Sequence, residues 1–242
     1  MNMSKKIKIL LVMLVLLTFL VGLIYIFCDY LPKKEEEEKN KQAWQDYYNA
    51  KVTQYDEENK GFAPGEVDVA FIGDSLTDGY DLKEYYPDLL VVNRGIGGDT
   101  TFGVEKRLKV SLYDLQPKIV VMLIGVNNLE TMFDNYEQIL IGMRDNLPNT
   151  DIILLSLTSM GKDWGKNNYL ASYNNVKIKA LAEKYGYTFI DIYTPLLNME
   201  TDEIYEHCTT DGGHLTPAGY AVLTEQISPV IESLLQVRKE AE

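Results

Sequence analysis

The chain has few of the residues that build metal centres and disulfide frameworks. Its 242 residues include two histidines, His207 and His214, and two cysteines, Cys28 and Cys208. Two cysteines do not suggest a disulfide framework, and they leave the redox compartment open. No cysteine pair has the spacing of zinc ligands, and two histidines are few for a metal enzyme. We therefore expect a protein that uses no metal and no other cofactor.

Basic side chains are scarce as well. The chain has 23 lysines and arginines against 36 aspartates and glutamates, a formal net charge of -13. Lys5, Lys6 and Lys8 are the only charged residues before Asp29, and they contribute +3, so the rest of the chain carries -16. Such a surface repels the phosphates of nucleic acids. We therefore exclude nucleic acid as a partner.

One long apolar run, Ile9–Cys28, follows a short basic tail over residues 1–8. The run carries no charge and is long enough to cross about 30 Å of hydrocarbon as a helix. It is longer than the core of a cleaved signal peptide, and Tyr25–Tyr30 offers no site of small residues for cleavage. We expect an uncleaved single-pass transmembrane anchor over 9–28. The lysines of the tail favour a cytoplasmic amino terminus, and hence a catalytic domain outside the cell membrane, although lysines flank the other end too.

Residues 29–65 read as a charged linker followed by an amphipathic helix. Lys33–Glu38 is a run of charged side chains that suits a solvated spacer. Aromatic and aliphatic residues then recur at helical spacing, at Trp44, Tyr47, Tyr48, Val52 and Tyr55. We expect this face to pack on the domain that follows, over residues 66–242.

Within 66–242, apolar strands alternate with segments of helical period. The predicted strands are Val67–Ile72, Leu89–Val92, Ile119–Ile124, Ile152–Leu157 and Tyr187–Ile192. Gly186 suits the end of one helix, and Thr216-Pro217 suits the start of the last, which Pro229 should kink. Continuous apolar strands between amphipathic helices indicate a parallel sheet covered on both faces. We predict an α/β fold, a three-layer α/β/α sandwich with a five-stranded parallel sheet.

Four polar or glycine-rich segments lie beside predicted strand ends or helix starts. They are Gly73-Asp74-Ser75-Leu76, the run 93–100, Gly125-Val126-Asn127-Asn128, and Asp211-Gly212-Gly213-His214. Ligands of open α/β sheets bind at the carboxyl edge of the strands, where these segments should gather. Serine is a poor nucleophile alone and needs a base, a group that orients the base, and donors for the oxyanion. The four segments offer each of these.

These segments resemble the four blocks of the SGNH (GDSL) hydrolase family of esterases and lipases, in order, over residues 66 to 235. The run Asn93-Arg94-Gly95-Ile96-Gly97-Gly98-Asp99-Thr100 is most similar to bacterial relatives of platelet-activating-factor acetylhydrolase catalytic subunits. Many family members have Gly-x-Asn-Asp in the third block, where this chain has Asn128 at the last position. The resemblance implies the flavodoxin-like fold of that family and a serine ester hydrolase.

The resemblance also implies roles for particular residues. Ser75 would be the nucleophile, His214 the base and later the acid, and Asp211 the group that orients His214. The oxyanion would be bound by the N–H groups of Ser75 and Gly98 and by the side-chain amide of Asn127. Asp74 is expected to bind loop backbone rather than to act in catalysis.

The substrate is less defined by the sequence. Leu129 and Trp164 lie in loops that follow strands, and we expect them to wall the substrate pocket. No long insertion could form a lid, which favours short acyl groups. The expected substrate is a small-molecule or glycan ester, with acetylated cell-surface carbohydrate first. A lysophospholipid or other lipid ester, an O-acyltransferase with the same triad, and a non-catalytic carbohydrate-binding domain are the alternatives, and the oligomeric state is left open.

Overall fold

The computed structural model describes residues 4–241, and these divide into two compact units between Asn49 and Ala50. Residues 1–3 of the predicted basic tail and residue 242 of the predicted domain lie outside the described residues. Each unit is described by itself.

The described part of the N-terminal unit is helical from Lys5 to Asn49. Helix α1 spans Lys5–Tyr25, a π-helical turn η1 spans Ile26–Tyr30, and helix α2 begins at Leu31 and continues to Asn59. Most of the described apolar side chains of α1 are exposed, and the helix is long and apolar enough to be a membrane span or a signal sequence. The charged run predicted as a spacer, Lys33–Glu38, forms the first turns of α2.

The last ten residues of α2 belong to the second unit. Tyr55 is 1% exposed, and Asn59 donates a side-chain hydrogen bond to the carbonyl oxygen of Val110 at 2.6 Å. The second unit therefore begins at Ala50, within α2.

The second unit is built on a five-stranded parallel sheet, as predicted. Its strands are β1 (Val69–Gly73), β2 (Val91–Gly95), β3 (Ile119–Leu123), β4 (Asp151–Leu155) and β5 (Thr188–Ile190). The strand order is β2-β1-β3-β4-β5, which is the flavodoxin-like order with its switch point between β1 and β3. All neighbouring strands are parallel, so their carboxyl ends lie at one edge.

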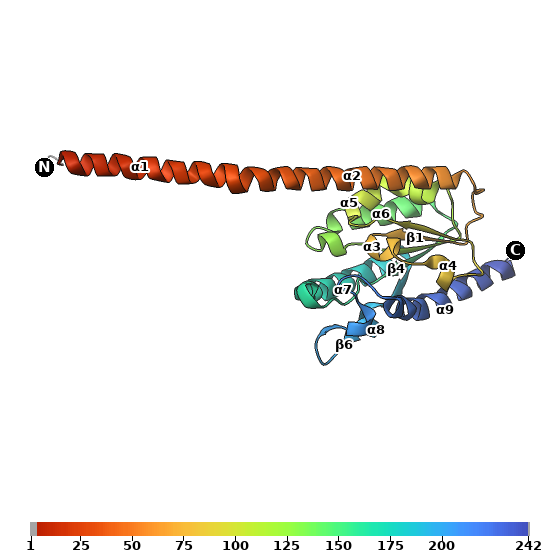
Figure 1. Ribbon diagram of the computed structural model, residues 1–242. Coiled ribbons are helices and arrows are strands. Elements are labelled where there is room, and N and C mark those ends of the chain that lie inside the picture. The colour runs from red at the N-terminus through yellow and green to blue at the C-terminus, as the bar shows by residue number, and fades with distance from the viewer. Residues whose placement is uncertain (1–3, 242) are drawn as a thin grey trace. The chain divides into compact units, whose positions relative to one another are not determined.

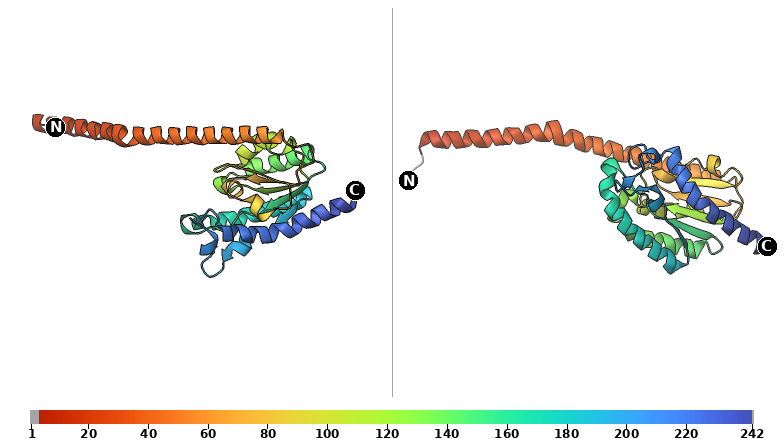
Figure 2. Two further views of the ribbon diagram at one scale, coloured as in Figure 1. Left: turned by 45° about the vertical axis from the view of Figure 1, so that its right-hand side comes forward. Right: turned by 90° about the horizontal axis from the view of Figure 1, so that it is seen from below.

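Helices cover both faces of the sheet, so the predicted three layers are confirmed (Figures 1 and 2). One face packs against α5 (Thr101–Leu108), the π turn η2 (Lys109–Tyr113), α6 (Phe133–Asn146) and α7 (Asn168–Tyr185). The other packs against α3 (Ser75–Asp78), α4 (Leu82–Tyr85), α8 (Tyr193–Leu196) and α9 (Pro217–Ala241). Side chains of a strand alternate between the faces: Val120 and Met122 enter the first core, and Val121 enters the second.

Short elements complete the unit around the carboxyl edge. They are the 3-10 turns η3 (Val126–Asn128), η4 (Lys162–Asn167) and η5 (Glu206–Cys208), and a small antiparallel pair, β6 (Leu197–Asn198) and β7 (Glu203–Ile204). The predicted helix ends are confirmed, because Gly186 ends α7 in the left-handed conformation and the Thr216 hydroxyl accepts from the N–H of Gly219 at the start of α9. Helix α9 contains Pro229 and continues beyond it to Ala241.

Candidate active site

Ser75 lies at the carboxyl edge of the sheet, two residues after β1 ends at Gly73. It is the first residue of the short helix α3, and Asp74 caps that helix by accepting a hydrogen bond from the N–H of Leu76 at 3.1 Å. Asp74 thus binds loop backbone, as expected. The buried apolar residues of β1 fix the strand, and the sharp turn after it leaves the Ser75 hydroxyl at the surface of the edge.

His214 and Asp211 lie on the loop before α9 and reach this hydroxyl. The Nε2 atom of His214 is 3.1 Å from Oγ of Ser75, and its Nδ1 atom is 2.8 Å from Oδ2 of Asp211. Asp211 also accepts from the N–H groups of Gly213 and His214, at 2.9 and 2.7 Å. Two hydrogen bonds from His214 hold the pKa of Asp211 well below its usual range: the one from the backbone N–H has the larger effect, and the one from the ring adds to it. The carboxylate therefore stays ionised beside the ring.

The other expected donors lie beside the serine. Gly98 has a φ of 75°, a left-handed conformation that favours glycine, and its lack of a side chain leaves its N–H open to approach. The side-chain amide of Asn127 donates one hydrogen bond to the carbonyl oxygen of Asp99 at 2.9 Å. An amide nitrogen carries two hydrogens, so Asn127 retains one for a ligand.

Together these residues border a cavity of about 330 Å³. Its lining comprises Ser75, Leu76, Gly97, Gly98, Val126, Asn127, Trp164, Gly213 and His214. Trp164, expected as a pocket wall, lies here, with its ring 6.5 Å from that of His214 in an edge-to-face arrangement. Leu129, the other expected wall, does not line the cavity: it is 8% exposed and lies in the core, because the turn η3 directs it inward. Val126 of the same turn takes that place.

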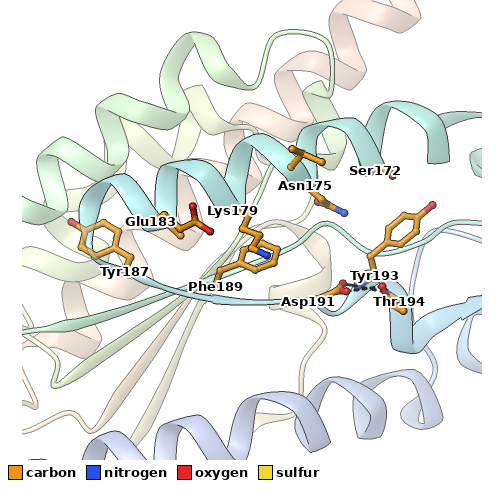
Figure 3. A pocket seen from close by; sticks show the side chains of 11 residues that line it. Ser172, Asn175, Lys179, Glu183, Tyr187, Phe189, Asp191, Tyr193 and Thr194 are labelled. Atoms are coloured by element: carbon orange, nitrogen blue, oxygen red, sulfur yellow. Dashed lines mark hydrogen bonds between the residues drawn. The ribbon is translucent and has the colours of Figure 1, made fainter.

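A second cavity, of about 530 Å³, lies between α7 and the end of β5 (Figure 3). Its one carboxylate near the strand end, Asp191, accepts hydrogen bonds from the N–H groups of Tyr193 and Thr194 and from the Thr194 hydroxyl. Asp191 therefore binds the first backbone N–H groups of α8. We take the smaller cavity as the candidate active site, because the hydroxyl of Ser75, the imidazole of His214 and the carboxylate of Asp211 are joined in sequence beside it.

A buried ion pair behind the cavity was not foreseen from the sequence. Arg107 of α5 contacts Asp99 at 2.8 Å, and both side chains are at most 1% exposed. The same guanidinium donates to the carbonyl oxygens of Gly73 and Arg94, at 2.9 and 2.7 Å. Arg107 thus links the carboxyl ends of β1 and β2 to the Asp99 side chain. The backbone carbonyl oxygen of Asp99 in turn accepts the hydrogen bond from the Asn127 amide. Arg107 lies beside the apolar residues Val104 and Leu108 of the amphipathic helix α5, and nothing in that pattern indicates this role.

Asp74 carries a pH-dependent share of the stability. Its side chain is 1% exposed, its Oδ2 atom has no hydrogen-bond partner, and burial raises its pKa from the usual 3.8 to about 7. Between those pH values the folded protein keeps a proton that the unfolded chain has lost, so stability is greatest below the unfolded pKa and falls as pH rises towards 7. The full loss should be on the order of 4 kcal/mol.

We expect Asp74→Asn to remove this contribution, since the amide keeps an oxygen for the N–H of Leu76 and cannot ionise. Urea unfolding of both proteins at pH 5 and pH 8 checks it. The variant should gain stability relative to wild type at pH 8. An equal fall in both proteins would assign the pH dependence to other groups.

An α/β/α sandwich with serine, histidine and aspartate side chains joined by hydrogen bonds at the carboxyl edge of its sheet is an arrangement found in serine hydrolases. Comparison with known proteins narrows the class. Residues 71–222 match the GDSL-like Lipase/Acylhydrolase family, and the rat platelet-activating factor acetylhydrolase IB subunit alpha2 is 32% identical over 184 residues, which cover 71% of this chain and 79% of that protein. The chain belongs to this family and is an ester-cleaving enzyme, as its sequence predicts.

Solved structures share the fold. A protein from Streptococcus pneumoniae named after platelet activating factor superposes with a TM-score of 0.74 at 24% identity, over 82% of this chain and 99% of that chain. Axe2, an acetylxylan esterase from Geobacillus stearothermophilus, superposes with a TM-score of 0.57 at 22% identity, over 69% of this chain and 95% of that chain.

Proposed function

We propose that the enzyme hydrolyses short-chain acyl esters, acetyl esters first, through an acyl-enzyme on Ser75. The observation that carries this proposal is the continuous contact from Asp211 to His214 to Ser75, over 2.8 and 3.1 Å, at the mouth of a cavity of about 330 Å³. A cavity of that size lies at the small end of ligand sites. It suits an acetyl or similarly short acyl group.

In the first half of the reaction, Nε2 of His214 takes the proton of the Ser75 hydroxyl while Oγ attacks the ester carbonyl. The ionised Asp211 holds the ring by Nδ1 and stabilises the imidazolium that forms. The N–H groups of Ser75 and Gly98 and the amide of Asn127 bind the oxyanion, each worth about 3–4 kcal/mol in the transition state. The alcohol leaves with the proton from His214, and the acyl group stays on Ser75.

In the second half, water gives a proton to His214 while its oxygen attacks the carbonyl of the acyl-enzyme. The bond to Oγ then breaks, the acid leaves, and His214 returns the proton to Oγ, which restores the Ser75 hydroxyl. A sugar hydroxyl in place of water would make the enzyme an O-acyltransferase. The similar proteins named above support hydrolysis of acetyl groups in particular, since an acetylhydrolase and an acetylxylan esterase are among them. For the alcohol part we propose carbohydrate at the cell surface.

The expected result of a substrate screen is a steep preference for short acyl chains. With p-nitrophenyl esters, kcat/KM should fall by about tenfold or more between acetyl and octanoyl, because the cavity of about 330 Å³, walled by Trp164 and Val126, must also admit the alcohol part of the ester. Acetylated xylan and acetylated cell-wall glycans should release acetate. Faster hydrolysis of octanoyl esters and lysophospholipids would instead assign a lipid esterase, and acetyl transfer to added sugar would assign an acyltransferase.

We further propose that residues 9–28 anchor the enzyme in the cell membrane as a single span, with the catalytic unit outside. The uncharged run within α1 and η1, and the basic residues ahead of it, support this orientation. The full-length protein should sediment with membranes and resist extraction by carbonate. External protease should digest the catalytic unit in intact spheroplasts. A mature protein in the medium that begins just after residue 28 would instead show a cleaved signal peptide.

A further inference from the structure

The glycine-rich loop that carries Gly98 is held by side chains from the last three turns of α2. The Tyr55 hydroxyl donates a hydrogen bond to the carbonyl oxygen of Gly95, the last residue of β2. The Tyr55 ring is 1% exposed, and burial raises its pKa, so the hydroxyl stays protonated and acts as a donor. This contact lies three residues before Gly98.

A second contact from the same helix reaches the middle of the loop. Lys51 forms an ion pair of 2.7 Å with Oδ1 of Asp78, and Oδ2 of Asp78 accepts a hydrogen bond of 3.3 Å from the N–H of Gly97. Asp78 is also the last residue of α3, the short helix that begins with Ser75. The Lys51–Asp78 pair therefore contacts both the glycine-rich loop, at Gly97, and the helix α3 that begins with Ser75.

Two further features make this attachment stiff. Arg94 stacks on the Tyr55 ring at 4.6 Å and donates to Glu58 and Asn59 at 2.7 and 2.9 Å, which fixes the helix end against β2. A side chain at Gly95 would lie 2.1 Å from the backbone nitrogen of Asp78, so the loop and α3 are in backbone contact there. A displacement of the loop at Gly95 would therefore also displace the helix of Ser75.

We propose that Tyr55 and Lys51 are positioning residues of the oxyanion hole: from the end of α2 they hold the segment Gly95–Gly98 against α3 so that the Gly98 N–H faces the reacting carbonyl. The proposal rests on the catalytic roles of Ser75 and Gly98 proposed above. Oxyanion donors act only when they are fixed before the reaction, and a loop with three glycines in four residues has wide backbone freedom that contacts from outside the loop help to restrict. The helix that continues from the apolar segment thereby takes part in building the site.

The test uses the full-length chain in detergent, with kcat and KM measured on p-nitrophenyl acetate. Tyr55→Phe keeps the ring on Arg94 and removes only the hydroxyl, and Lys51→Met removes only the charge. Each should lower kcat by about tenfold while KM stays within about twofold, because the oxyanion forms only in the transition state. Lys51→Arg should retain the wild-type kcat.

The rate of covalent labelling by a fluorophosphonate should fall in parallel with kcat, because the phosphoryl oxygen occupies the same hole. The matched control is Tyr187→Phe, which removes a hydroxyl that donates to the carbonyl oxygen of Leu140 at 3.1 Å; Tyr187 does not line the cavity that contains Ser75. This variant should keep kcat and the labelling rate.

A wild-type kcat in both Tyr55→Phe and Lys51→Met would overturn the proposal, as would an equal loss of kcat in Tyr187→Phe, which would reflect stability alone. The underlying function fails differently: a wild-type protein that neither hydrolyses the ester nor takes up the label on Ser75 would overturn both proposals before any variant is compared.

Discussion

Replacing Ser75 with alanine should abolish ester hydrolysis and leave the protein folded. The change removes the atom that forms the acyl-enzyme, and loss of a triad nucleophile costs about 10⁶-fold in kcat in the best-measured serine hydrolase. The Ser75 side chain has one interaction to lose, the 3.1 Å contact between Oγ and Nε2 of His214. The unfolding free energy should therefore change by no more than about 0.5 kcal/mol.

The measurement is turnover of p-nitrophenyl acetate by purified wild type and variant, with circular dichroism to show equal folding. A fluorophosphonate should label the wild type on the peptide that contains Ser75 and leave the variant unlabelled. Ser172→Ala is the matched control, because Ser172 lines the cavity beside β5, and it should keep full activity. If Ser75→Ala keeps more than a few per cent of the activity, the nucleophile lies elsewhere and the label will locate it.

The fold could be predicted from the sequence because the core strands are uninterrupted apolar runs. Ile119–Leu123 forms β3 within one residue of its predicted end, since every side chain there enters one of the two cores. The predicted Leu89–Val92 lies two residues ahead of β2, which runs from Val91 to Gly95. Asn93 and Arg94 are polar, and only the structure shows that they bond to the backbone of α3 and to the end of α2.

The candidate site could be predicted to the extent that it depends on strand ends. A parallel sheet brings the segments after its strands to one edge, so Ser75 and Asn127 could be placed there without knowing any contact. Contacts that come from outside the four blocks could not be predicted. Arg107 lies within an amphipathic helix and Tyr55 within an aromatic stripe, and neither pattern distinguishes a residue that binds loop backbone from one that only packs.

The two histidines should differ completely in their effect on activity. Nε2 of His214 lies 3.1 Å from Oγ of Ser75, whereas His207 lies in η5 with its ring 5.6 Å from that of Tyr205 and is absent from the cavity lining. His214→Ala should lower kcat/KM by about 10³-fold or more, because the proton of Ser75 then has no acceptor. His207→Ala should leave kcat/KM within about twofold of wild type.

The pH profile separates the two residues further. Hydrogen bonds from His214 keep the pKa of Asp211 well below its usual range, so this carboxylate stays ionised at mildly acid pH. The activity of wild type should fall at acid pH as the base becomes protonated, since an imidazolium cannot accept the serine proton. His207→Ala should retain this acid limb, and the residual activity of His214→Ala should lack it. If His207→Ala is inactive and His214→Ala retains both activity and the acid limb, the base is assigned to the wrong histidine and the pairing with Asp211 has no catalytic role.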